Sequence, residues 1–211
     1  MIAVIGIPRL RGEATDADVA GLAASIAAAA AAADSRVELV GKIGDDAAGD
    51  AALLALSRRG IGHVATLRDP ARGTPVVQDG DDDPDDQTGA GAAAERAPVL
   101  DAGDVGLALR YLPELGVIVT VHVAPEVVEE AASAAGWART TLIVVVEPGA
   151  APPEGLPPDA LALAADEVDE LGGVGAAIGR YAAALDQGRP ADAAYAELVA
   201  AGGSSVADPI A

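Results

Sequence analysis

Apolar and polar positions follow two different patterns along the chain. Short continuous runs of Val, Ile and Leu are typical of strands buried on both faces. Longer Ala-rich segments with helical spacing lie between them, and several begin at Pro or end at Gly. We expect strands over 2–5, 37–43, 117–123, 141–146 and 161–164, and helices over 18–33, 47–59, 104–112, 125–135, 178–186 and 191–201. This order indicates βαβ units and a mostly parallel sheet covered by helices on both faces.

The middle of the chain departs from this alternation. Two short strands are expected over 64–67 and 74–77, around the turn 69–73. Asp then fills six of the eight positions of 79–86, and like charges at this density favour a solvated loop. A calcium site is the alternative, although the loop lacks the ligand spacing and the terminal Glu of an EF-hand.

Composition predicts a core built from small side chains. Hydrophobic residues make up 51% of the 211 residues, but aromatic residues make up only 2% and Phe is absent. Ala and Val bury little area each, at about 25 cal/mol per Å². We therefore expect close packing between elements, modest stability, and one large domain rather than two small ones.

The net charge of −20 argues against binding to nucleic acid or to anionic membranes, which requires basic patches. It favours a solubility adaptation, with an acidic surface for a basic partner as the alternative. Cysteine is absent, so disulfides and thiol chemistry are excluded. The apolar run 27–33 is too short to cross a bilayer and the N-terminus lacks a basic leader, so we expect a cytoplasmic protein. His63 and His122 lack ligand spacing and are interpreted as structural residues.

Several segments together carry a family resemblance. The stretch 40–50 predicts a strand, a Gly-Asp-Asp turn and the start of a helix, and Gly73, Thr74 and Pro75 follow it. A Pro…Gly-Glu segment at 8–13 comes before it, and two helices close the chain. In this order the segments resemble the ribokinase (PfkB-type) carbohydrate kinases, of which the chain looks like a shortened, degenerate member.

The resemblance implies a ribokinase-like three-layer α/β/α fold with a mostly parallel central sheet, in which sheet and lid are reduced. Residues 1–211 then form a single domain, within which 64–92 are the reduced lid and acidic loop. The Gly/Ala stretch 88–92 looks like an anion-binding signature, but it precedes the strands at 117 and 141 and is interpreted as a linker.

The resemblance also implies a sugar site near the start of the chain. Residues 20–25 fall on the family's first signature, Gly-Gly-x-Gly-x-Asn, of which Gly21 is retained, while Ser25 replaces the Asn that contacts sugar hydroxyls. The family's sugar-binding Asp is absent after Gly6. Asp16 and Asp18 are its candidate replacements, and both could equally cap a helix.

Two further motifs bear on phosphoryl transfer. Asp166 and Asp169 fall on the family's Asn-x-x-Glu motif, which organises magnesium and phosphate; the alternative is that they begin a surface helix. Gly173 and Gly175 fall on its second signature, Gly-Ala-Gly-Asp, whose glycines let a helix N-terminus approach a phosphoryl group. The catalytic Asp of that signature is Ala176 here, and alanine cannot accept a proton.

These substitutions lead to three functional hypotheses. The one we favour is a degenerate PfkB-type homologue that is catalytically impaired and retains binding of a small sugar, an anion, a protein partner or a second copy of itself. The second is an active kinase that uses ATP and Mg to phosphorylate a sugar or nucleoside hydroxyl, with Asp166, Asp169 or a relocated carboxylate as base. The third is an inert product of gene decay. The family's adenine pocket has no counterpart between 171 and 173, so no cofactor is firmly expected.

Overall fold

Six parallel strands form the central sheet of the computed structural model, which describes residues 1–12, 17–77, 96–167 and 173–202. Their order across the sheet is β5-β4-β1-β7-β8-β9, and every neighbouring pair is parallel. The strands are β1 (Ile2–Ile5), β4 (Val37–Gly44), β5 (Thr66–Asp69), β7 (Val117–Val121), β8 (Thr141–Val146) and β9 (Leu161–Ala164). The sheet confirms the α/β class that the sequence predicts.

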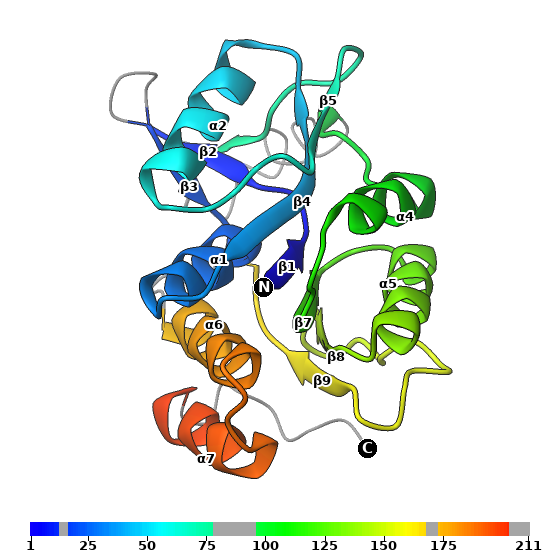
Figure 1. Cartoon of the computed structure of the whole chain (residues 1–211). Coiled ribbons are helices and arrows are strands. Elements are labelled where there is room, and N and C mark those ends of the chain that lie inside the picture. Colours follow the sequence, from blue (N-terminus) through cyan, green and yellow to red (C-terminus); the bar gives the residue numbers. More distant parts are fainter. Residues whose placement is uncertain (13–16, 78–95, 168–172, 203–211) are drawn as a thin grey trace.

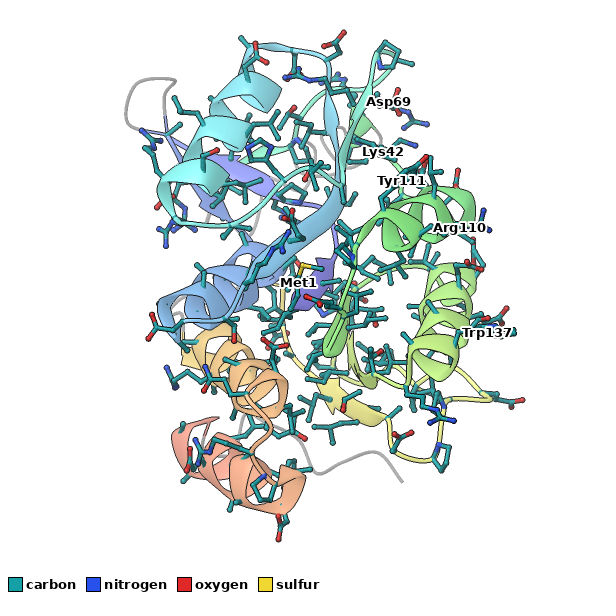
Figure 2. The ribbon with its side chains drawn as sticks, viewed as in Figure 1. Met1, Lys42, Asp69, Arg110, Tyr111 and Trp137 are labelled. Atoms are coloured by element: carbon teal, nitrogen blue, oxygen red, sulfur yellow. The ribbon has the colours of Figure 1, made fainter. Side chains whose placement is uncertain are left out.

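Helices cover both faces of this sheet (Figure 1). Ile2 and Val4 face a core shared with α1, α2, α6 and α7, whereas Ala3 and Ile5 face a second core shared with α4 and α5. The helices are α1 (Leu22–Ala32), α2 (Ala47–Arg58), α4 (Ala102–Tyr111), α5 (Pro125–Ala138), α6 (Gly173–Asp186) and α7 (Ala191–Gly202). Within the described ranges, none of the helices has the length and hydropathy that crossing a bilayer demands.

A second, smaller sheet has the order β3-β2-β6. Its strands are β2 (Arg9–Arg11), β3 (Asp18–Ala20) and β6 (Val76–Val77), with β2 antiparallel to β3 and parallel to β6. Arg58 and Arg59 at the end of α2 anchor β3, through the Ala17 carbonyl and the Asp18 carboxylate. The small sheet is thereby fixed to the α2 side of the molecule (Figure 1).

Several element boundaries differ from the sequence-based expectation. The helix expected over 18–33 begins only at Leu22, because Gly21 has a φ of 88° and Asp18–Ala20 pairs with β2 instead. The strand expected over 64–67 lies at 66–69 and joins the edge of the main sheet, so within its described part, 64–77, the expected lid region contributes β6 to the small sheet. The helix expected from 178 begins at Gly173. The acidic loop 79–86 and the stretch 88–92 lie outside the described residues.

Close packing between elements is confirmed where α1 meets α6. A Cβ on Gly179 of α6 would clash with the Ile26 carbonyl oxygen and lie 2.7 Å from the Ala29 Cβ. Only glycine allows the two helices to approach this closely. Because the two backbones lie so close together, the short apolar side chains of both helices are buried between them despite their small size.

The Gly-Asp-Asp turn after β4 joins α2 to the segment before β6. Asp46 is the N-cap of α2 and accepts a hydrogen bond from the Gly49 N–H at 2.7 Å. It also accepts from the Thr74 N–H at 2.9 Å and the Thr74 hydroxyl at 2.7 Å. Desolvation raises the pKa of Asp46, but the hydrogen bonds from Thr74 and Gly49 outweigh it and hold that pKa below its usual value.

Candidate functional site

Strand ends, helix starts and the small sheet meet at the carboxyl edge of the main sheet. β1 ends at Ile5 and is followed by Gly6, which lies three residues before the start of β2, and β7 ends just before His122. A Cβ on Gly6 would lie 2.9 Å from the Ala23 Cβ and 3.3 Å from the Val121 carbonyl oxygen, so the first turn of α1 sits directly on this edge. In open parallel sheets, ligands bind in the crevice outside the carboxyl ends of the strands.

Three charged side chains from distant parts of the chain converge there. Glu167, which follows β9, places Oε2 3.0 Å from Nδ1 of His122 and Oε1 3.3 Å from Nε of Arg9 on β2. A Cβ on Gly21 would lie 2.8 Å from the same Oε1, so the carboxylate also borders the start of α1. The side chain of His122 is 9% exposed, that of Glu167 26% and that of Arg9 42%. The cluster is therefore buried at His122 and open to solvent at Arg9.

The surroundings of His122 favour its doubly protonated form. Its Nδ1 faces the Glu167 carboxylate, and its Nε2 lies 2.8 Å from the Ala165 carbonyl oxygen. Both partners are acceptors, so an imidazole protonated on both ring nitrogens can donate a hydrogen bond to each of them. Desolvation lowers the pKa of His122, but Glu167 and the Ala165 carbonyl outweigh it and raise the pKa above its usual value. The backbone of His122 is left-handed, with φ at 47°.

A second feature of this edge is the start of α6. Gly173 opens the helix and is exposed, and among the described residues no atom lies within 4 Å of where its Cβ would be. Gly175 is buried, and Ala176 is half-buried in the first turn. A helix start combines unpaired N–H groups with the positive end of the helix dipole, which suits an anion.

Comparison with solved structures covers nearly the whole chain. Sa239 aligns at 14% identity with a TM-score of 0.71, over 100% of this chain and 95% of its own. Aminoimidazole riboside kinase from Salmonella enterica, complexed with aminoimidazole riboside and an ATP analog, aligns at 13% identity with a TM-score of 0.61, over 98% of this chain and 93% of its own. Fructokinase with bound ATP from Xylella fastidiosa aligns at 15% identity with a TM-score of 0.50, over 95% of this chain and 65% of its own.

The chain has the ribokinase-like fold. The structural similarity shows the fold, but at 13–15% identity it does not show the activity. At 211 residues, the chain spans 65% of the fructokinase chain. No family model matches the sequence, and no curated protein matches it either.

The ribokinase-like chain brings together only some of the residues singled out in its sequence. Gly21 is the N-cap of α1 and borders the Glu167 carboxylate, and Ser25 lies one turn further along that helix. Asp166 is exposed just after β9. Asp16 and Asp169 lie outside the described residues.

The metal site suggested at Asp166 and Asp169 stays a prediction, because Asp169 lies outside the described residues. The described residues contain no group of three or more His, Cys, Asp or Glu side chains that could hold a metal ion. Five residues, 168–172, join Glu167 to α6.

Sequence reasoning missed the three residues that form the cluster. His122 was interpreted as structural, and neither Arg9 nor Glu167 was singled out. A partial signal was present for Glu167, which comes shortly after the strand expected over 161–164, whereas His122 falls inside the strand expected over 117–123 and follows the strand only in the structure. Their approach to Arg9 depends on β2, a three-residue strand that the hydrophobic pattern does not predict.

Proposed function

We propose that this ribokinase-like protein binds a small, hydroxyl-rich ligand of the sugar class at the carboxyl edge of its sheet and does not phosphorylate it. The observation that carries the proposal is Ala176 in the first turn of α6. The resemblance to carbohydrate kinases puts the catalytic base at this position, and a methyl group cannot take a proton from a hydroxyl. General-base catalysis contributes about 10²–10⁴-fold to a rate.

The reduced nucleotide side supports the same proposal. Two of the similar structures contain ATP or an ATP analog by their own descriptions, and both are kinases. In the family, several strands and loops between the counterparts of Leu171 and Gly173 supply the adenine pocket. This chain has only Gly172 between those two positions, too little to add a strand.

The cluster of Arg9, His122 and Glu167 supports ligand binding. Arg9 and Glu167 are partly exposed, and together they offer donors and acceptors of the kind that hydroxyl groups require. His122 is fixed by the Ala165 carbonyl, which limits the conformational entropy that binding costs. A site of this kind can retain affinity after its chemistry is lost.

An active kinase is the second candidate, and one observation favours it. Gly173 and Gly175 lie at a helix start, as the phosphate-binding signature of the family requires. Positioning and electrostatic stabilisation do most of the work in phosphoryl transfer, so a site without its base can keep residual turnover.

Calorimetric titration tests the proposal, with a panel of aldoses, ketoses and nucleosides, and separately with ATP–Mg. We expect at least one hydroxylated ligand to bind and ATP–Mg not to bind. Arg9→Gln should weaken the ligand, whereas Arg189→Gln, which removes the same charge from the ion pair with Glu197, should not. Binding of no panel member, or tight binding of ATP–Mg, would overturn the proposal.

A further inference from the structure

We propose that Glu167 fills an anion site from within the chain, and that the carboxylate or phosphate group of a small ligand takes its place between Arg9, His122 and the start of α1. The inference rests on the proposed function and adds to it the charge of the ligand. A sugar acid or a sugar phosphate would carry both the hydroxyl groups and the anionic group.

The first argument is the balance of charge. One carboxylate faces two cations, and each of its oxygens has a separate partner, Nε of Arg9 for Oε1 and Nδ1 of His122 for Oε2. Glu147 also acts on His122, through space. If Glu167 moved away, Arg9 and Nδ1 of His122 would both be left without their anionic partner, in a chain that is otherwise strongly acidic. Such a pair needs an anion.

The second argument is the space beside Gly21. A side chain at this position would collide with Oε1 of Glu167, because its Cβ would lie only 2.8 Å away. The φ of 88° at Gly21 disfavours other residues as well. The N-cap of α1 makes no side-chain hydrogen bond and its first turn has no acidic residue, so the negative group beside this helix start comes from Glu167. The position is shaped for an oxygen anion rather than for a side chain of α1.

The third argument is the fixed orientation of His122. The Ala165 carbonyl holds Nε2, so Nδ1–H remains aimed at the crevice whichever anion occupies it. The left-handed backbone at His122 is rare outside glycine, and such strain gathers at functional sites. Arg9 and Glu167, by contrast, are partly exposed and can exchange with solvent. The site thus has one fixed donor and one open side.

The test compares Glu167→Gln with Asp159→Asn. Both variants remove one negative charge, but Asp159 is exposed and precedes β9, whereas Glu167 follows that strand. In calorimetric titrations with inorganic phosphate and with acetate, at least one anion should bind Glu167→Gln about tenfold or more tightly than wild type, as expected for charge-assisted hydrogen bonds freed from an internal competitor. Asp159→Asn should bind like wild type, and Arg9→Gln should abolish the gain in Glu167→Gln. Equal affinities in the two single variants would refute the anion site.

A measurement on the wild-type chain covers the case in which Glu167→Gln does not fold. The chain has two histidines, and His63 contacts Ser57 near the end of α2, away from the site. In ¹⁵N NMR, millimolar phosphate or acetate should move the imidazole signals of His122 and leave those of His63 in place. Signals of His122 that do not respond to either anion, or that move no more than those of His63, would refute the site.

The two proposals fail in different ways. If an uncharged sugar binds the wild-type chain but neither anion gains affinity in Glu167→Gln, only the anion site is wrong. If no hydroxylated ligand binds but the anions do, the anion site stands and the sugar-class ligand is wrong.

Discussion

At the scale of single residues, Asp46 shows how one carboxylate stabilises several segments. Its two oxygens cap α2 and hold both the backbone and the hydroxyl of Thr74, whose oxygen in turn accepts the Gly44 N–H at 2.9 Å. β4, α2 and the segment before β6 therefore meet at this side chain. The Gly-Asp-Asp and Gly-Thr motifs that suggested a kinase family have a structural role here.

Replacing Asp46 by Ala should lower the free energy of unfolding by about 1–3 kcal/mol, because the helix loses its cap and Thr74 loses a buried partner. Urea unfolding, monitored by circular dichroism, measures this change in the free energy of unfolding. Asp45→Ala is the matched control: its exposed ion pair with Arg68 should contribute about 0–1 kcal/mol. Equal losses in the two variants would contradict the role given to Asp46.

The stability that Asp46 contributes should depend on pH in a defined direction. Its pKa is lower in the folded chain than the usual value of 3.8, so the contribution is fully present above that value and is lost as the pH falls through the folded-state pKa. The difference between wild type and Asp46→Ala should therefore narrow in urea titrations as the pH is lowered below about 4. A difference that grows under acid conditions would be inconsistent with this.

At the scale of elements, glycine sets the distance between α1 and α6. Gly179 packs against Ile26 and Ala29 with no room for a side chain, although glycine in a helix interior costs about 0.5–1 kcal/mol relative to alanine. The packing that this close approach allows stabilises the chain by more than glycine destabilises the helix, because the core has few large side chains.

Gly179→Ala should destabilise the chain by about 1–3 kcal/mol, because the added methyl group forces the helices apart despite its better helix propensity. Gly136→Ala in α5 is the matched control. No atom of the described residues lies within 4 Å of where its Cβ would be, and the change should stabilise by about 0.5–1 kcal/mol. Thermal unfolding of both variants checks that their stabilities change in opposite directions. A Gly179→Ala variant more stable than wild type would show that the helices are not in close contact.

The elements with strong local signals could be predicted from the sequence. β1, β8 and β9 have the expected bounds, and the left-handed Gly60 ends α2 where expected. β2 and β3 could not be predicted, because three-residue strands exist only through their pairing with each other and with β6. The helix expected from 18 was placed too early for the same reason.

At the scale of the whole molecule, the fold could be predicted but the cluster could not. Alternating buried strands and helices fix a parallel sheet, and a parallel sheet gathers its strand ends along one edge. Which side chains meet there depends on crossovers that bring Arg9 and Glu167, 158 positions apart, within 3.3 Å of each other. Ala176 lies in the first turn of α6, although the sequence places the start of that helix only at 178.

The most direct test of binding without phosphoryl transfer is ADP release from ATP–Mg, measured with the full sugar panel for wild type and for Ala176→Asp. Under the proposed function, wild type lacks the base and both proteins lack the nucleotide segment, so neither should release ADP above background. ADP release by wild type that depends on a sugar would contradict the account, and release by Ala176→Asp alone would show that the nucleotide is held after all.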